Sequence, residues 1–185
     1  TDSLNWLAGI LNADARQLTA DLEQLQAPGR TVFMPYLGGE RTPHNDAHVR
    51  GGFLHLAHNT DRAAMTRAVL EGVTHAVRDS FDAMVQTGTN IDSLIAVGGG
   101  SKSDYWLKAI ATSLNMPIQI PAAGDFGGAL GAARLGRMAA TGEGAELAVP
   151  PPISRVIEPD VHLVDTFAEA HARYADTYRA VKHLR

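Results

Sequence analysis

Three consecutive glycines, Gly98, Gly99 and Gly100, are the residues of this sequence best suited to bind a ligand. They follow a short apolar run, Leu94 to Val97, and precede a helical pattern that begins near Ser103. Because glycine has no Cβ, a flat ring or a phosphate can approach such a turn closely, and the first amides of the helix are donors for an anion. This arrangement favours nucleotide binding, although a glycine run after a strand is also typical of an ordinary tight turn.

Two familiar glycine motifs do not fit this stretch. A P-loop needs glycine directly before its lysine, and Ser101 stands before Lys102. The dinucleotide fingerprint needs glycine at the position of Ser103 and an acidic residue at the end of the next strand, where the chain has Ile120 and Pro121. A Rossmann-type dehydrogenase is therefore disfavoured, and a preference for NAD over ATP in a binding assay would revive it.

The elements around the glycines predict an α/β unit. Pro117 to Pro121 is a second short apolar run, and Asp125 is placed to cap a helix that carries Leu130, Ala133 and Leu135. Strand, helix, strand and helix in this order predict parallel strands, with a ligand crevice beyond their carboxyl ends.

The rest of the chain reads mostly as helices. Helical spacing of apolar residues predicts helices over 1–11 and 15–25, a long helix that Thr60 or Asp61 caps and that ends near Gly88, and a last helix from Leu163 onward. The long helix should bury one stripe, made of Met65, Val69, Val73, Ala76, Val77, Ser80, Phe81 and Met84. A strand is expected over 31–34, an irregular loop over 35–52, and an extended surface connection over 141–152.

The composition argues against several classes of partner and of location for this chain. The 185 residues are 45% hydrophobic, which is typical of a single globular domain, here 1–185. The net charge is −4 and no long basic run is present, so nucleic acid is not an expected partner. The chain has no cysteine, no apolar run of membrane-spanning length and no signal-like start, so we expect no membrane partner and a cytoplasmic location.

Three motifs together resemble a known family. VGGGSKSDYW, with MPYLGGERTPHND upstream and GALGAARLG downstream, resembles the carboxyl-terminal domain of the FGGY carbohydrate kinases, and the xylulose kinases most closely, from about Ser3 to Gly142. The resemblance implies an α/β, ribonuclease H-like domain of the actin/Hsp70/hexokinase superfamily, truncated at its start. It also implies ATP and Mg²⁺ as cofactors, with the metal held mainly outside this chain, and a pentulose sugar bound by an amino-terminal domain.

The resemblance places five residues against the adenosine. These are Asn5, Gly99, Gly100, Ser101 and Asp104, with Asp104 as an acceptor for the purine or ribose. A solvent-facing helix residue explains Asn5 equally well. No catalytic residue and no metal ligand is assigned within the chain, because the family's catalytic aspartate would precede Thr1. In isolation the chain is then expected not to catalyse.

Several residues, and the activity itself, have more than one interpretation from the sequence. Glu40 and Arg41 are expected to brace their loop rather than to react, and His44, His48, His55 and His58 to lie on the surface rather than to bind a metal. A sibling kinase for ribulose, gluconate or glycerol, or a non-catalytic nucleotide-binding module, would carry the same motifs. The aromatic stripe of the last helix packs either on its own domain or against a second subunit in a homodimer.

Overall fold

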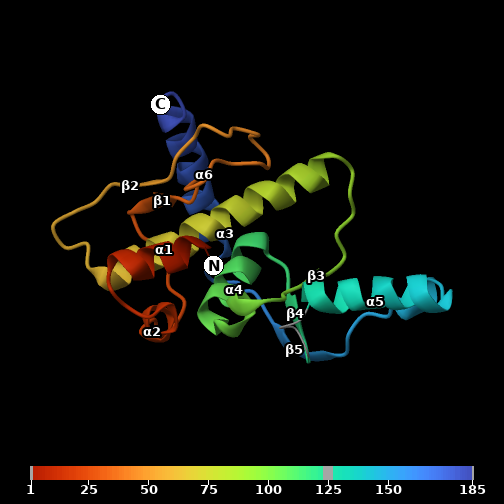
Figure 1. Cartoon of the computed structure of the whole chain (residues 1–185). Coiled ribbons are helices and arrows are strands. Elements are labelled where there is room, and N and C mark those ends of the chain that lie inside the picture. The colour runs from red at the N-terminus through yellow and green to blue at the C-terminus, as the bar shows by residue number, and fades with distance from the viewer. Residues whose placement is uncertain (1, 123–126, 185) are drawn as a thin grey trace.

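The fold is organised around one long central helix, α3, with α1, α2, α4, α6 and β1 packed along it (Figure 1). The structure is a computed structural model that describes residues 2–122 and 127–184. Its helices are α1 (Asp2–Ile10), α2 (Ala15–Ala20), α3 (Arg62–Gln86), α4 (Asp104–Leu114), α5 (Gly127–Thr141) and α6 (Val164–Val181), with short 3-10 turns η1 (Gly99–Lys102) and η3 (Ala145–Leu147). Its strands are β1 (Val32–Met34), β2 (Gly52–Leu54), β3 (Leu94–Ile95), β4 (Ile118–Pro121) and β5 (Ile153–Ile157).

The β3-α4-β4-α5 unit confirms the predicted order of strands and helices. β3 and β4 are parallel, with Leu94 opposite Ile118, and the glycine turn lies between β3 and α4. Asp125, the predicted cap of α5, falls outside the described residues.

Two strands were not predicted. β2 pairs antiparallel with β1, inside and just beyond the stretch expected to be a loop, and β5 pairs antiparallel with β4. β5 contains the β-branched residues Ile153, Val156 and Ile157, which favour a strand. Most of its side chains are exposed, however, and apolar and polar residues do not alternate along it, so it lacks the pattern of a half-buried strand.

α3 begins and ends close to the predicted places, but its buried surface differs from the predicted stripe. Asp61 caps it by accepting the N–H of Ala64 at 2.8 Å. Val69 is fully buried as expected, whereas Val77 is 37% and Met84 46% exposed. The reason is that α1, β1, α4 and α6 surround the first half of the helix, which buries several of its faces, while its last turn extends beyond them.

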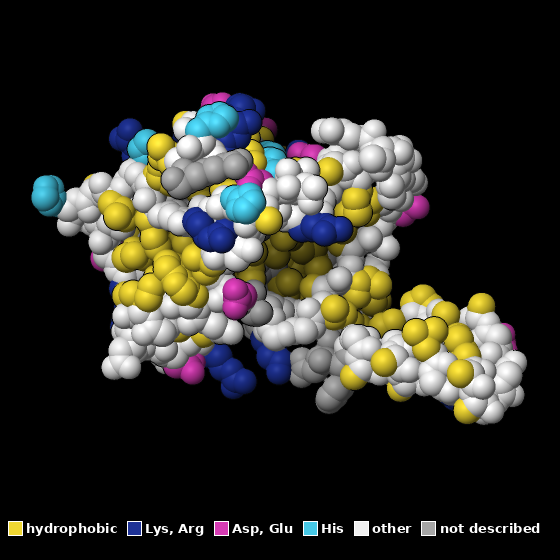
Figure 2. Space-filling view, turned by 45° about the horizontal axis from the view of Figure 1, so that its top comes forward, with side chains coloured by type: hydrophobic (Ala, Val, Ile, Leu, Met, Phe, Trp, Pro, Cys, Tyr) yellow, Lys and Arg dark blue, Asp and Glu magenta, His cyan; other side chains and the backbone are white. Residues whose placement is uncertain are grey.

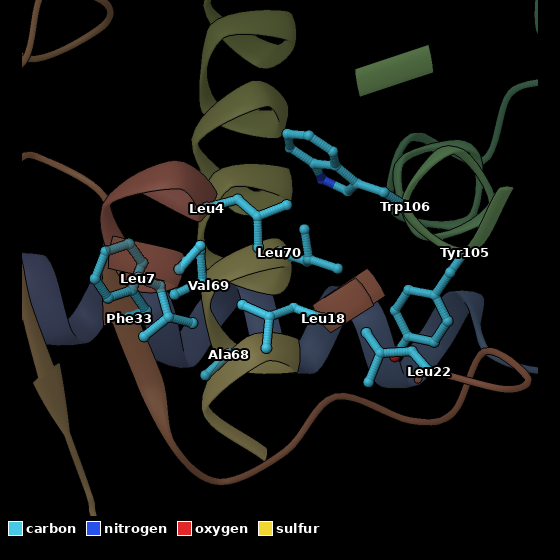
Figure 3. Close-up of a cluster of buried hydrophobic side chains, with 11 residues drawn as sticks. Leu4, Leu7, Leu18, Leu22, Phe33, Ala68, Val69, Leu70, Tyr105 and Trp106 are labelled. Carbon is cyan, nitrogen blue, oxygen red and sulfur yellow. The ribbon is translucent and has the colours of Figure 1, made fainter. Parts of the chain in front are cut away.

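The main hydrophobic core lies where α1, α2, β1, α3 and α4 meet (Figure 3). Leu7, Val69 and Leu70 are fully buried there, and Leu22 lies beside Tyr105. The helix predicted over 15–25 ends early, at Ala20, although Leu22 and Leu25 still pack against this core. A helix of this length depends on tertiary contacts, and burial of Leu22 against Tyr105 takes precedence over continuing the helix.

Gly72 allows the closest approach in the core. A Cβ built on Gly72 would lie 2.2 Å from the carbonyl oxygen of Phe33 in β1, far inside van der Waals contact. A glycine at this position of α3 therefore permits close packing against β1.

The aromatic face of α6 packs within the chain, the first of its two expected arrangements. Tyr174 is fully buried, and its hydroxyl donates to the hydroxyl of Tyr36 at 2.7 Å. Phe167 is fully buried as well, and Tyr178 is 8% exposed. α6 therefore packs against α3, α4 and β1.

α5 stands away from the body of the molecule. None of its described side chains is buried, Leu135 is 67% exposed, and the space-filling view shows apolar side chains along it (Figure 2). In the described ranges, no helix is long and apolar enough to span a membrane.

Glu71 is a buried carboxylate next to the close contact. It is 5% exposed and accepts the N–H of Gly29 at 3.1 Å. Burial raises its pKa from 4.5 to about 7, against the opposing effects of the Gly29 hydrogen bond and of Arg67 and Arg173.

We expect Gly72→Ala to destabilise the fold by about 1–3 kcal/mol, because the new methyl group overlaps a backbone oxygen that cannot move alone. Gly131→Ala in α5 is the matched control, since its Cβ would meet nothing within 4 Å. That change should stabilise the protein slightly, by about 0.5–1 kcal/mol, because alanine favours a helix. Urea unfolding of both variants measures the difference, and a Gly72→Ala protein as stable as the parent would contradict the contact.

Glu71 should make stability fall as pH rises. A carboxyl whose pKa is higher folded than unfolded stabilises the folded state below its unfolded value, and this contribution is lost between pH 4.5 and about 7. The loss amounts to at most about 3 kcal/mol at 1.36 kcal/mol per pKa unit. Glu71→Gln keeps an acceptor for Gly29 without a charge, so it should flatten the pH profile of urea unfolding between pH 4 and 8. Glu169→Gln, on the exposed face of α6, is the control and should leave the profile unchanged.

Candidate functional site

A cavity of about 770 Å³ opens between the first two helices and the glycine turn. α1, α2 and the residues just after α2 form one wall, and η1 with the start of α4 forms the other. Among the described residues, its lining is made of Leu4, Asn5, Ala15, Arg16, Thr19, Ala20, Leu22, Glu23, Gly99, Gly100, Lys102, Ser103, Asp104, Tyr105 and Trp106. The volume is within the range of pockets that take small molecules and cofactors.

The glycine turn has a conformation that requires its first glycine. Gly98 has φ of 83°, in the left-handed region, and its carbonyl accepts the N–H of Ser101 at 3.1 Å and the Ser101 hydroxyl at 2.7 Å. A Cβ on Gly99 would meet nothing within 4 Å. The turn therefore leaves open space at Gly99, on the lining of the cavity.

The start of α4 supplies the aromatic part of the second wall. Ser103 caps the helix by accepting the N–H of Trp106 at 3.3 Å. The indole N–H of Trp106 donates to the hydroxyl of Thr74 in α3 at 3.2 Å, which fixes the ring. Tyr105 and Trp106 are 9% and 6% exposed, so they belong to the core while also lining the cavity. Such a wall suits a flat, partly apolar ligand.

Four of the five predicted binding residues line this one cavity. Asn5 lies on α1, Gly99 and Gly100 in the turn, and Asp104 in the first turn of α4. Ser101 is not among the lining residues, because it is buried and its hydroxyl is bound to the Gly98 carbonyl. The structure thus brings Asn5 to the glycine turn across 94 residues of sequence and places Ser101 as a support of the turn.

The sequence did not indicate the contribution of α2 and the residues just after it. Arg16, Thr19 and Glu23 line the cavity, but their pattern is that of the outer face of an amphipathic helix. These residues lie opposite the apolar stripe of the predicted helix. Any solvent-facing residue has the same position, so the sequence did not distinguish them as cavity residues. Asp14 holds the start of this helix by accepting the N–H groups of Arg16 and Gln17.

Asp104 has a partner that the sequence did not indicate. Arg155 in β5 donates to both of its carboxylate oxygens, from Nη2 to Oδ1 at 2.6 Å and from Nη1 to Oδ2 at 2.9 Å. This hydrogen-bonded guanidinium lowers the pKa of the Asp104 carboxyl and raises the pKa of Arg155. Asp104 is therefore ionised and held at the edge of the cavity.

The loop over 35–52 lies apart from the cavity lining and is tied to α3 and α6. Glu40 accepts the N–H of His44 at 2.8 Å, so it braces the loop through the backbone rather than through Arg41. The ring of His44 stacks on Tyr178 with centroids 3.7 Å apart, and Asp79 binds His171 at 2.7 Å. Within residues 2–122 and 127–184, no group of three or more histidine, aspartate or glutamate side chains could hold a metal ion.

Comparison with known proteins gives the family. Residues 4–140 match the model of the FGGY family of carbohydrate kinases, C-terminal domain. Xylulose kinases from Escherichia coli K12 and Staphylococcus xylosus are 40% and 39% identical over 144 and 139 residues, which cover 76% and 74% of this chain and 29% of each relative. A solved structure of a xyloylose kinase from Brucella ovis has a TM-score of 0.91 at 51% identity and covers the whole chain and 39% of that protein.

The α/β fold is that of the sugar kinases in the actin/Hsp70/hexokinase superfamily, as expected. The chain belongs to the FGGY family of carbohydrate kinases, of which it contains the carboxyl-terminal domain. It spans about a third of the length of the curated relatives it matches.

Proposed function

We propose that this chain is the nucleotide-binding part of a xylulokinase, which transfers the γ-phosphoryl group of ATP to D-xylulose. One observation carries the proposal: Asn5, Gly99, Gly100 and Asp104, expected from the family motifs to contact adenosine, line a single cavity. The named relatives are xylulose kinases, which supports the choice of sugar.

The cavity fits an adenine nucleotide in shape and chemistry. The open space at Gly99 accommodates a flat ring, and Asn5 and Asp104 offer hydrogen-bond partners for purine or ribose. Arg16 and Lys102 bring positive charge to the same cavity, as a polyphosphate requires. When bound, ATP would supply the phosphoryl group, and Mg²⁺ would shield its charge.

The metal ligands and the catalytic base are part of the proposal that rests on the resemblance alone. Mg²⁺ is usually held by one or two carboxylates together with substrate phosphates and water. As the resemblance implies, we propose that these carboxylates and the catalytic base lie outside this chain. The assigned work of this chain is to bind and orient the nucleotide.

We expect Gly99→Val to abolish nucleotide binding without loss of stability. The valine side chain would enter open space, so the fold tolerates it, but it would occupy the room for the adenine ring. Calorimetric titration with ATP, ADP and NAD measures the effect, and urea unfolding checks the fold. Gly136→Val, in open space on α5, is the control for the added side chain.

The same titration separates the alternatives. Tight ATP binding by Gly99→Val would contradict the placement of the site. Binding of NAD in preference to ATP by the parent would favour the dehydrogenase alternative. A panel of D-xylulose, D-ribulose, gluconate and glycerol, phosphorylated by the protein together with its sugar-binding part, would decide between sibling kinases.

The 185-residue chain by itself should transfer no phosphate. With ATP, Mg²⁺ and D-xylulose at saturating concentrations, a coupled assay should detect no sugar-dependent release of ADP, because no catalytic base is assigned within the chain. The control is nucleotide binding by the same sample. ADP release that depends on the sugar would place the reacting centre within these residues and overturn this part of the proposal.

A further inference from the structure

The cavity walls carry charges of both signs. Arg16 and Lys102 attract an anionic ligand, whereas Glu23 and Asp104 repel it. Asp104 matters most for a ligand at the glycine turn, because it is four residues from Gly100 and begins α4. An uncompensated carboxylate at this place would oppose binding of a polyphosphate.

Arg155 meets this carboxylate with an oriented fork. Its two terminal nitrogens reach the two oxygens of Asp104 at 2.6 and 2.9 Å, the bidentate geometry that fixes a carboxylate most strongly. The position of Arg155 is set by the sheet, since it lies opposite Ile120 in the β4-β5 pair. The contact thus joins β5 to the start of α4, 51 residues away in sequence.

We propose that Arg155 is a positioning residue for the nucleotide: it orients the Asp104 carboxylate at the edge of the cavity and offsets its charge, so that a phosphate-bearing ligand is not repelled. The inference rests on the proposed function of the cavity. Arg155 is not among the lining residues, so it acts through Asp104.

The remaining acceptor capacity of Asp104 makes this role consistent with a ligand contact. Each carboxylate oxygen has two lone pairs, and the Arg155 fork uses one on each oxygen. The others are available for a ribose or purine donor. The low pKa of the carboxyl keeps it in the acceptor form, and the guanidinium next to it cancels most of its field on a nearby phosphate.

A purely structural ion pair predicts a different behaviour. If Arg155 only helped to hold β5 against α4, its removal would weaken every ligand of the cavity by the same factor, or none. If it offsets charge, the loss must grow with the negative charge of the ligand and shrink with salt. The comparison of ATP with uncharged adenosine therefore distinguishes the two roles.

The experiment is calorimetric titration of the parent and Arg155→Ala, with ATP titrated directly and adenosine measured by competition. In ~0.02 M salt we expect ATP to bind about ten-fold more weakly to Arg155→Ala, and in ~0.5 M salt only about two-fold, because the Debye length shortens from about 20 Å to about 4 Å. Adenosine should change by less than about two-fold at either salt concentration, since it carries no charge.

Three further variants make the test specific. Arg137 is another exposed arginine whose guanidinium binds both oxygens of a carboxylate, that of Glu143, and it lies in α5, far from α1 and α2. The ATP affinity of Arg137→Ala should therefore not change. Arg155→Lys keeps the charge and should retain most of the ATP affinity even if Arg155→Ala folds poorly. The double variant Asp104→Asn with Arg155→Ala lacks both charges of the pair, so its net charge is that of the parent and it should bind ATP within about two-fold of the parent.

Each outcome has one meaning. An equal loss for ATP and adenosine, a loss that does not respond to salt, or a similar loss in Arg137→Ala would overturn the inference and leave the proposed function intact. If Arg155→Ala does not fold, an Arg155→Lys protein that loses ATP as strongly as adenosine has the same consequence. Failure of the parent to bind any nucleotide would instead overturn the proposed function, and the role of Arg155 with it.

Discussion

The contact of Gly72 with the carbonyl oxygen of Phe33 sets the position of α3, and the cavity depends on that position. With β1 pressed against it, the first half of α3 is surrounded by α1, α4 and α6, so even polar side chains on this half are buried. Thr74 is one of them, and its hydroxyl accepts the indole N–H of Trp106. A backbone approach in the core thereby fixes an aromatic wall of the candidate site.

The two walls of the cavity are far apart in sequence and are joined by one core. Leu4 and Leu22 from one wall and Tyr105 and Trp106 from the other belong to the same cluster of buried side chains around α3 (Figure 3). Because a close-packed interior tolerates little displacement, the shape of the cavity follows from the packing beneath it. The cavity is thus a property of the domain core rather than of a separate loop.

The sequence was sufficient for the parts of the structure that local chemistry determines. The glycine turn and the helix starting after Ser103 depend on residue types with strong local preferences, and both were predicted. The buried surface of α3 was not, because a helix in contact on several sides has no single apolar stripe. The cavity-facing residues of α2 were also missed, since an exposed polar residue has the same pattern whether it meets solvent or a ligand.

β5 shows the limit of pattern reading most clearly, and it carries the partner of Asp104. Its side chains are mostly exposed, so neither alternation nor burial marks the strand, and nothing local connects Arg155 to a residue 51 positions earlier. An acidic residue at the start of α4 is subject to two opposing electrostatic effects. The positive end of the helix dipole stabilises its negative charge, whereas a phosphate bound nearby would be repelled by it. In the proposed nucleotide site, a guanidinium from a neighbouring strand would let one carboxylate accommodate both effects. The contact ties the sheet to the edge of the cavity, and only the folded chain reveals it.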